Sequence, residues 1–366
     1  MTDAGGKPIV FFSKMAQGVP SLGPPQREAG GVFITNRRET LTFFQRNFPG
    51  LAALKHRKLL ASLQASHRCL RAAAVIVSGA PHTSVLGRYQ AKRAMIFHGT
   101  FRNLTKVGIQ QLKDFDHVFL NGPRMERMLN RHPDLITFSA TVSGYTPFAD
   151  FPQPSPEHRR NVFSKLNLDP GKKLVFYAPA RRGCGSWTAC AEKIATDLPD
   201  DCVLVMRPHP NQALHGTAAE KALYQRLTAL FDTRRNGLID LATCSFPELL
   251  SVADLLISDA TSPTEEFMLY NRPQIITETY PRGKWRENYQ HDGMHQDDID
   301  ELMGLYDCAW SFEKDGFKNW RQAIQTALAE PEKHRGIQRR YFASAFGETI
   351  TDAPARVAEV LTRGVG

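Results

Sequence analysis

The most constraining feature of this chain is a recurring pattern in which a short apolar run leads directly into a polar turn. Residues 94–97 precede His98, residues 202–206 precede the Arg207–Pro210 turn, and residues 255–257 precede Ser258 and Asp259. Apolar runs of this length suit strands buried in a parallel sheet. Polar side chains that follow such strands gather at one edge of the sheet, where open α/β folds bind ligands. The pattern therefore predicts an α/β fold with sites at the carboxyl ends of strands.

The same pattern extends over most of the chain. Further apolar runs occupy residues 9–12, 72–79, 117–120, 173–178, 238–240 and 274–277. Residues 39–63 show helical spacing that Pro49 and Gly50 interrupt, which predicts two helices there. Strands that alternate with helical segments indicate βαβ units and parallel sheets.

A proline-rich segment divides the chain. Residues 147–158 contain four prolines and no periodicity, which indicates a linker. A chain of 366 residues also exceeds what one core usually supports. We expect a Rossmann-like domain over residues 1–150, a second over 151–345, and a helix in 346–366 that packs back on the first. Two such domains facing each other across a cleft is the simplest architecture.

Charge is unevenly divided between these parts. Residues 1–150 contain 20 Lys and Arg against 8 Asp and Glu, whereas the remainder contains 26 against 29. A basic first domain suggests an anionic partner, and nucleic acid, a phosphate-rich polymer and an anionic membrane surface all fit. No helix-turn-helix, RNP or zinc-finger pattern accompanies the charge, so nucleic acid is not expected.

Several protein classes find no support in the sequence. No apolar stretch approaches the roughly 20 residues that span a bilayer, and the amino terminus lacks a secretory signal. We therefore expect a cytoplasmic protein that can meet the inner membrane face only peripherally. The six cysteines form no Cys-x-x-Cys pair and are expected to be reduced thiols. We expect no cofactor and identify no metal-ligand cluster, although the pattern leaves a metal requirement open.

Three turns in the second half suit phosphate binding. The two prolines around His209 make its turn rigid, and Arg207 adds a guanidinium for a diphosphate. Arg181 and Arg182 follow another strand, where paired guanidiniums bind phosphates well. The segment 259–267 is typical of a helix start, with Thr261 or Ser262 as N-cap, Pro263 as first helical residue and a capping box. A helix amino terminus also binds phosphate, but each turn could equally be a structural connection.

The His98 turn lies in the basic half and suggests a different task. Gly99 allows a substrate to approach the backbone closely. Histidine is the usual side chain for accepting a proton from an attacking hydroxyl near neutral pH. Taken alone, His98 could also be a structural histidine.

The order of these pieces resembles a known family. His-Gly-Thr at 98–100, Tyr-Ala-Pro-x-x-Arg at 177–182, Arg-Pro-His-Pro at 207–210 and Ser-Asp-x-Thr-Ser at 258–262 follow one another, and a Phe-Gly-Glu at 346–348 comes later. This order is similar to that of the CDP-glycerol glycerophosphotransferase family, which includes primases and polymerases of teichoic-acid synthesis. The resemblance covers about residues 94–362. It implies a GT-B fold and transfer of glycerol phosphate from a CDP-linked donor to a hydroxyl of a cell-surface polymer, with release of CMP.

The resemblance also implies roles for individual residues. His98 matches the general base, and His209 matches a histidine that contacts the donor phosphates. Thr261 and Ser262 match a phosphate-binding pair, and Glu266 matches a carboxylate for a donor hydroxyl. The candidate residues are, on the acceptor side, His98, Gly99, Thr100 and Lys106, and on the donor side, Arg182, Arg207, His209, Ser258, Asp259, Thr261, Ser262 and Glu266.

The chain departs from the family pattern in three places. Phe97 replaces a tryptophan, Ala260 replaces an aromatic residue, and residues 101–103 replace a Pro-Leu-Lys, so that Lys106 comes about two residues late. These departures affect what the resemblance implies about the identity of the acceptor and about the nucleotide of the donor.

Two other kinds of protein fit part of the pattern. The first is a GT-B nucleotide-sugar glycosyltransferase or a UDP-N-acetylglucosamine 2-epimerase-like enzyme, which also places a His-Pro turn and a Ser/Glu helix start around a nucleotide diphosphate. The second is a non-enzymatic basic protein that binds nucleic acid or a membrane through residues 1–150.

Overall fold

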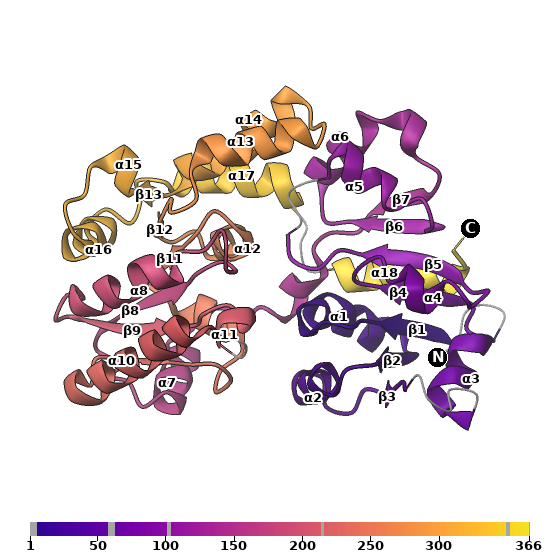
Figure 1. The fold of residues 1–366 in the computed structure, drawn as a ribbon, viewed down its shortest axis with the longest axis horizontal. Helices are drawn as coiled ribbons and strands as arrows, with labels where there is room; N and C mark the ends of the chain where they lie inside the picture. The colour runs from indigo at the N-terminus through magenta and orange to yellow at the C-terminus, as the bar shows by residue number, and fades with distance from the viewer. Residues whose placement is uncertain (1–5, 58–62, 101–103, 214–215, 349–351, 366) are drawn as a thin grey trace. The chain divides into compact units, whose positions relative to one another are not determined.

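The computed structural model describes residues 6–57, 63–100, 104–213, 216–348 and 352–365. The chain divides into two compact units (Figure 1). Unit 1 comprises residues 1–150, 289–298 and 343–366, and unit 2 comprises residues 151–288 and 299–342. Each unit is built on one parallel sheet.

Unit 1 contains a seven-stranded sheet of order β3-β2-β1-β4-β5-β6-β7. Its strands are β1 (Ile9–Phe12), β2 (Val32–Thr35), β3 (Ala53–Lys55), β4 (Val75–Ser78), β5 (Lys92–Ile96), β6 (His117–Leu120) and β7 (Ser139–Val142). Its helices are η1 (Ala16–Gly18), α1 (Val19–Ala29), α2 (Arg38–Asn47), α3 (Ala65–Ala72), α4 (Thr83–Leu86), α5 (Lys106–Gln110), α6 (Pro123–Asn130), η3 (Pro133–Leu135), η4 (Thr146–Asp150) and α18 (Ala353–Arg363).

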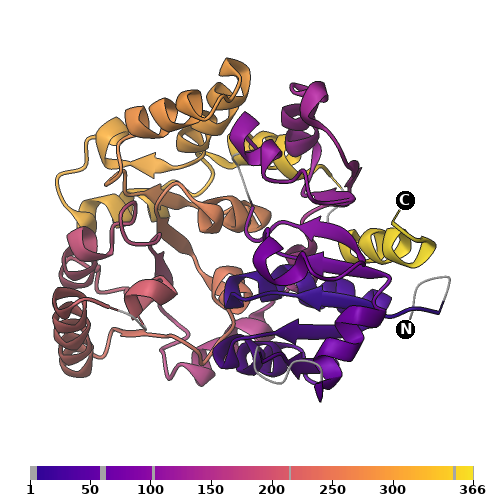
Figure 2. The ribbon, with the colours of Figure 1, turned by 45° about the vertical axis from the view of Figure 1, so that its right-hand side comes forward.

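Unit 2 contains a six-stranded sheet of order β10-β9-β8-β11-β12-β13, flanked by helices (Figure 2). Its strands are β8 (Lys173–Ala178), β9 (Cys202–Met206), β10 (Gly237–Ile239), β11 (Leu255–Ser258), β12 (Gln274–Ile276) and β13 (Trp310–Ser311). Its helices are α7 (Pro156–Lys165), α8 (Trp187–Thr196), α9 (Pro210–Ala213), α10 (Ala218–Arg234), α11 (Phe246–Val252), α12 (Ser262–Phe267), η5 (Met268–Tyr270), η6 (Gly304–Cys308), α15 (Phe312–Asp315) and α16 (Trp320–Ala329). The division between the units falls within α13 (Arg282–His291), α14 (Gln296–Met303) and α17 (Arg335–Phe346).

The alternation of side chains along a strand explains why both faces of the unit 1 sheet are covered. On β1, Ile9 and Phe11 join a core with α1, α2 and α18, whereas Val10 and Phe12 join a second core with α3 and α4. All four side chains are buried. A strand buried on both faces has to be apolar throughout, so the continuous apolar runs in the sequence are explained. The prediction of two Rossmann-like α/β parts with parallel sheets is confirmed.

The structure corrects one predicted helix and adds strands. Residues 53–55, predicted as part of a second helix, form β3 and pair with β2 from Phe33 to Thr35. Its three residues are half-buried. A three-residue edge strand carries almost no periodicity, so pairing with a neighbour decides its conformation. Strands β2, β7 and β13 were likewise not predicted.

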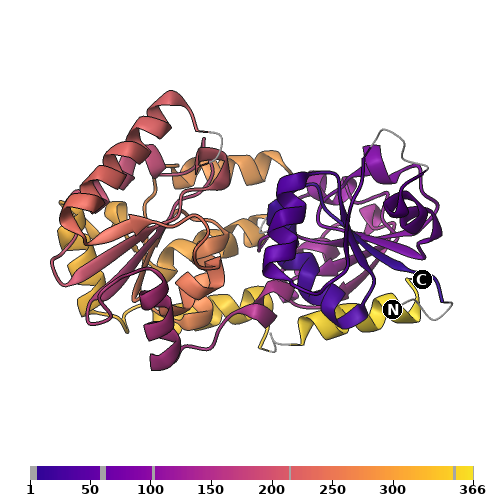
Figure 3. The ribbon, with the colours of Figure 1, turned by 90° about the horizontal axis from the view of Figure 1, so that it is seen from below.

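The carboxyl-terminal helix completes unit 1. Val357, Ala358 and Leu361 of α18 enter the core that contains β1 and α1. Figure 3 shows α18 as the yellow helix next to the carboxyl terminus, beside the indigo elements of unit 1. Residues 289–298 also lie in unit 1, where Asp297 forms an ion pair of 3.0 Å with Arg131. In the part of the chain that the structure describes, no helix has the length and apolar character needed to cross a bilayer.

Candidate active site

In both sheets the direction in which the chain adds strands reverses at one point. The reversal lies between β1 and β4 in unit 1 and between β8 and β11 in unit 2. Ligands of open α/β sheets bind outside the carboxyl ends of strands at such a point. The predicted residues follow β5 in unit 1 and follow β8, β9 and β11 in unit 2, so both sets lie at or beside a reversal.

In unit 1, His98 is held by the backbone of the neighbouring strand. Its Nδ1 lies 2.8 Å from the carbonyl oxygen of Gly79, the residue directly after β4. Because a carbonyl can only accept, Nδ1 carries the proton in this contact. The neutral ring then presents Nε2 as a hydrogen-bond acceptor, which is the form that a general base requires.

The backbone after His98 is fixed from the next strand. The Asn121 side-chain amide donates to the carbonyls of Gly99 and Thr100, at 3.3 and 3.1 Å. Gly99 has a φ of +65°, which a glycine adopts without the steric cost of a Cβ. Thr100 is buried, so its position in this turn is also structural.

Lys106 lies at the start of α5, and its side chain packs against Gly293 within unit 1. Its side chain is exposed. The residues of the departing segment, Phe101, Arg102 and Asn103, lie outside the described residues.

A second histidine lies near His98 and was not predicted. His82 follows β4 and is 8% exposed, with its ring edge-on to Phe12. Burial, together with smaller effects of the charges of Lys14 and His98, lowers the pKa of His82 to about 4. The ring is therefore neutral at physiological pH. The signal in the sequence was a histidine three residues after a strand-end glycine, within Gly79–His82.

In unit 2, His209 sits in its proline turn as predicted and is locked to Asn211. The Asn211 side-chain oxygen lies 2.9 Å from His209 Nδ1, and the Asn211 backbone amide lies 3.3 Å from the same atom. Burial lowers the pKa of His209, the bond to Asn211 raises it, and the Arg181 guanidinium lowers it. A neighbouring anion would reverse the last effect and favour the charged ring.

Arg182 supports this turn from the side. Its guanidinium binds both carboxylate oxygens of Glu220, at 3.0 and 2.5 Å, and the carbonyl of Asn211 at 3.1 Å. The bonds from Arg182 lower the pKa of Glu220 to about 2. Glu220 is itself held by the capping box of α10 with Thr217. Among the described residues, Arg181 has no such carboxylate partner, so it is the arginine of this turn that is available to an anion.

The hydrogen-bond partners of Arg207 differ from the predicted phosphate. Its guanidinium donates to the Asp240 carboxylate at 2.5 Å, to the Asp240 carbonyl at 2.9 Å and to the Cys244 carbonyl at 2.8 Å. Its side chain is 14% exposed. Arg207 therefore holds the loop after β10, and its predicted contact with phosphate stays a prediction. An aspartate directly after the apolar Leu238 and Ile239 was the only sign of it in the sequence.

Ser258 and Asp259 hold the ends of the strands together. The Ser258 hydroxyl donates to the Ala178 carbonyl at 2.6 Å. The Asp259 carboxylate accepts from the Ala180 amide at 2.7 Å, from Ser186 and from Thr277 at 2.5 Å. Both residues are almost fully buried. They position the Arg181 turn beside the start of α12 and are not themselves open to a donor.

The start of α12 differs in detail from the prediction. Thr261 is the N-cap, but its side chain makes no capping hydrogen bond, and Pro263 is the second helical residue. Thr261 therefore does not form the capping box that the sequence predicts here. Thr261 and Ser262 are half-buried, and Glu266 is 8% exposed. The two hydroxyls therefore stay at the edge of the sheet, as a phosphate contact requires.

The structure thus joins Arg181, Arg182 and His209 into one cluster in unit 2, with Asp259 bracing it. His98, Gly99 and Thr100 form a separate cluster in unit 1. Within the described residues, no group of three His, Cys, Asp or Glu side chains is arranged to bind a metal ion.

Solved structures that are similar in fold include a polymerase and a glycosyltransferase. The wall teichoic acid polymerase TagF matches with a TM-score of 0.61 and 16% identity, over 98% of this chain and 89% of that one. Alr3699/HepE from Anabaena, solved with UDP, matches with a TM-score of 0.55 and 13% identity over 97% and 99% of the two chains. A glycosyltransferase from Rickettsia africae matches with a TM-score of 0.53 and 12% identity over 98% of each chain. These matches confirm the predicted GT-B-like fold class.

No curated protein sequence matches this chain. A family model does match it, over residues 41–290, which include His98, the Arg181 turn, His209 and the start of α12. The model describes CDP-glycerol:poly(glycerophosphate) glycerophosphotransferases. The match covers more than half of the chain and the same motifs that the sequence singled out. The chain therefore belongs to the CDP-glycerol:poly(glycerophosphate) glycerophosphotransferase family.

Proposed function

We propose that this enzyme transfers glycerol phosphate, or a related alditol phosphate, from a CDP-linked donor to a hydroxyl of a polymer acceptor and releases CMP. The observation that carries the proposal is the bond between His98 Nδ1 and the Gly79 carbonyl, because it leaves Nε2 as a proton acceptor. Family membership supports the donor class, and the cluster of Arg181, Arg182 and His209 at strand ends of unit 2 is the second support.

The reaction is a displacement at the phosphorus that carries the glycerol. The acceptor oxygen attacks this phosphorus, while His98 Nε2 takes the hydroxyl proton. The bond between that phosphorus and the bridging oxygen breaks, and both its electrons leave with CMP. A new phosphodiester joins the glycerol to the acceptor, so atoms and charge balance.

The leaving CMP needs compensation for its developing charge. His209 and Arg181 supply hydrogen-bond donors, with the Thr261 and Ser262 hydroxyls as further donors. As the anion binds, its charge opposes the effect of Arg181 and raises the pKa of His209. The charged ring can then donate from Nε2 to phosphate while Nδ1 donates to Asn211. In this proposal Arg182, Arg207, Ser258 and Asp259 position these groups.

The test offers CDP-glycerol and a hydroxyl-bearing polymer and measures CMP. We expect CMP release, and we expect His98→Ala to slow it by about 10²- to 10⁴-fold while donor binding persists. His132→Ala, which removes the histidine at the N-cap of η3, is the matched control and should retain the wild-type rate. A His98→Ala variant with unchanged turnover would contradict the assignment of the base.

A nucleotide-sugar glycosyltransferase is the second candidate. The observation in its favour is the fold shared with Alr3699/HepE, which was solved with UDP. A panel of CDP-alcohols and NDP-sugars separates the two candidates. Release of UDP from a UDP-sugar, without CMP from any CDP-alcohol, would replace our proposal with this one.

A further inference from the structure

The turn after β12 contains a residue in an unusual backbone conformation. Glu278 has a φ of +51°, in the left-handed region that favours glycine. Among the described residues, the other non-glycine residues with a positive φ are Asn167, Arg235 and Asn271. These three stand at the carboxyl ends of α7, α10 and η5, where a left-handed residue commonly closes a helix. Of this set Glu278 alone follows a strand, so helix closure does not explain its conformation.

An ion pair holds Glu278 in this conformation. Arg282, at the start of α13, donates to both oxygens of its carboxylate, at 2.5 and 2.6 Å. The same guanidinium donates to the Ser311 hydroxyl at 3.1 Å and lies 4.2 Å from the centroid of the Tyr306 ring. Burial raises the pKa of Glu278, but the hydrogen bonds from Arg282 and its other neighbours outweigh burial and lower the pKa below its usual value. A charged, two-point bond therefore offsets the cost of the backbone conformation.

The turn at Glu278 brings two threonines to one carboxylate oxygen. Thr277 and Thr279, on either side of Glu278, both donate to Asp259 Oδ1, at 2.5 and 3.3 Å. In an extended strand, residues two positions apart lie about 6.6 Å from each other along the strand. The bend at Glu278 is what lets both hydroxyls reach the same atom.

Thr279 lies at the edge of the unit 2 sheet where ligands are expected. It follows β12 and is exposed. Asp259, to which it donates, also accepts from the Ala180 amide in the Arg181 turn at 2.7 Å. The Asp259 carbonyl accepts from the Thr261 amide at 2.7 Å. Asp259 thus joins the turns after β8, β11 and β12, so Thr279 stands beside the groups proposed to contact the phosphates.

The hydrogen bond to Asp259 decides what the Thr279 hydroxyl can offer to a ligand. Because a carboxylate can only accept, the hydroxyl donates its proton in this contact and keeps its lone pairs. It cannot at the same time donate to a phosphate oxygen. Thr279 therefore presents a hydrogen-bond acceptor, and a ligand has to supply the proton.

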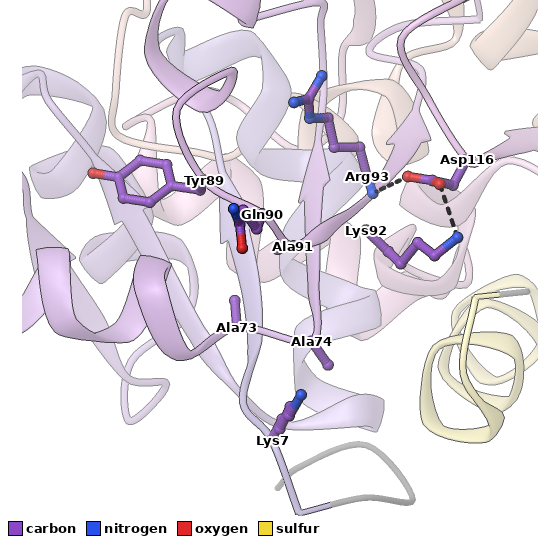
Figure 4. Close-up of a pocket in the computed structure, with 9 residues that line it drawn as sticks. All are labelled: Lys7, Ala73, Ala74, Tyr89, Gln90, Ala91, Lys92, Arg93 and Asp116. Carbon is purple, nitrogen blue, oxygen red and sulfur yellow. Dashed lines mark hydrogen bonds and ion pairs between the residues drawn. The ribbon is translucent and has the colours of Figure 1, made fainter.

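The carboxylate of Asp116 in unit 1 shows how a threonine differs from other partners. Asp116 precedes β6 and lines a pocket with Lys7, Lys92 and Arg93 (Figure 4). It accepts from the Lys92 ammonium at 3.0 Å and from the Arg93 backbone amide at 2.8 Å, as the dashed lines in Figure 4 mark. Both of these partners are donors without a lone pair. A hydroxyl that donates to a carboxylate is different, because it stays an acceptor toward a ligand.

We propose that Thr279 accepts a hydrogen bond from an alcohol hydroxyl of the donor, and that Glu278, held by Arg282, is the residue that positions it. The inference rests on the proposed function, since it takes a CDP-linked alcohol as the donor. In such a donor, ribose and glycerol carry the hydroxyls that flank the diphosphate, whereas the base lies beyond the ribose. Both sources offer the same chemistry to Thr279.

The test measures donor binding by calorimetry without an acceptor, so that it does not depend on turnover. The probes are CDP-glycerol, CDP-propanol without glycerol hydroxyls, the 2′-deoxy and 3′-deoxy forms of CDP-glycerol, and UDP-glycerol. We expect the wild type to bind CDP-glycerol about three- to tenfold more tightly than the probe that lacks the recognised hydroxyl. Thr279→Val should abolish this preference by weakening the binding of CDP-glycerol, and Thr279→Ser should restore it. The probe whose disadvantage disappears identifies the hydroxyl as one of glycerol or of ribose.

Thr228→Val is the matched control for the loss of a threonine hydroxyl. Thr228 on α10 is also exposed, and its hydroxyl donates to the Tyr224 carbonyl at 3.0 Å. This variant should keep the wild-type preference. If Thr279→Val weakened the binding of all probes equally, Thr279 would have a structural role only and the proposal would be overturned. Unchanged binding in Thr279→Val, or a change only between the CDP and UDP probes, would overturn it as well.

Two variants of Glu278 test its role as a positioning residue. Glu278→Gly adopts a φ of +51° without steric cost and should keep the hydroxyl preference. Glu278→Ala loses the ion pair but keeps the steric cost, so it should lose the preference. The same result in both variants would overturn the positioning role.

The outcome for this inference is separable from that for the proposed function. A hydroxyl preference that depends on Thr279, without CMP release by the wild type, contradicts only the proposed function. A wild type that releases CMP but binds all probes equally contradicts only this inference.

Discussion

Single residues of one type take different roles in this enzyme because their neighbours differ. Arg181, Arg182 and Arg207 all follow strands of the unit 2 sheet. Arg207 is bound by Asp240, Arg182 is bound by Glu220, and Arg181 lies beside His209 without a described carboxylate partner. The sequence predicted correctly that arginines stand at these strand ends. It could not predict which arginines form ion pairs within the protein, because both acidic partners come from other elements.

This difference predicts distinct effects for two neighbouring substitutions. Arg181→Gln should weaken donor binding about tenfold by removing one charged hydrogen bond to phosphate, with little change in stability. Arg182→Gln should lower both the melting temperature and turnover, because Glu220 loses its partner and the Asn211 turn loses its support. Steady-state kinetics and thermal melting measure both. Arg160→Gln on the exposed face of α7 is the control, and identical profiles for the two variants would refute the distinction.

His82 makes the stability of unit 1 depend on pH. Its pKa is about 4 in the folded protein and 6.5 when exposed, so the unfolded chain binds the proton more tightly. Its contribution is complete above pH 6.5 and is lost as the pH falls toward 4, by up to about 3 kcal/mol. His82→Phe keeps the aromatic contact with Phe12 and should remove this part of the pH dependence.

The measurement follows hydrogen exchange of the β1 and β4 amides between pH 7 and pH 4. Exchange suits unit 1 because all four tryptophans, at positions 187, 285, 310 and 320, belong to unit 2. An acid dependence that is as steep in His82→Phe as in the wild type would assign the effect to other groups.

At the scale of elements, the strand-end turns are held by a buried carboxylate. Asp259 follows β11 and bonds to the loops after β8 and β12. The prediction of βαβ units from apolar runs was confirmed for the long, buried strands. It was wrong for β3, and it missed β2, β7 and β13, because short or half-buried strands depend on pairing that periodicity does not report.

Replacing this carboxylate should loosen the donor side of unit 2. In Asp259→Asn the amide group would face the Ala180 and Ser186 amides or the Thr277 hydroxyl, so at least one buried donor loses its acceptor. We expect a loss of about 2–4 kcal/mol in the stability of unit 2 and weaker donor binding. Unfolding followed by tryptophan fluorescence measures it, since Trp187 follows Ser186 at the start of α8. Asp200→Asn, on a side chain that is 98% exposed, should have no effect.

For the whole molecule, the chain order and the units do not coincide. Residues 289–298 and 343–366 belong to unit 1, although they follow most of unit 2 in the sequence. Leu361 of α18 is fully buried in the core of unit 1. The stability of unit 1 therefore depends on the end of the chain.

This connection predicts a localised effect of a change in α18. Leu361→Ala should cost unit 1 about 2–5 kcal/mol by leaving a cavity beside α1. Hydrogen exchange should accelerate in β1 and α1, while the tryptophan fluorescence of unit 2 should report unfolding at an unchanged denaturant concentration. Glu359→Ala on the exposed face of α18 is the control. Uniform destabilisation of both units would contradict the division of the chain into two units.

The sequence by itself determined the fold class, the family and the positions of His98 and His209 after their strands, because a strand buried on both faces must be a continuous apolar run. Only the tertiary structure decided which polar groups form bonds within the protein and which remain for a ligand. That decision depends on partners far along the chain, such as Gly79 for His98, Glu220 for Arg182 and Asp240 for Arg207. Hydrogen bonds and ion pairs of this kind act over a few ångströms in space, and local sequence patterns do not record them.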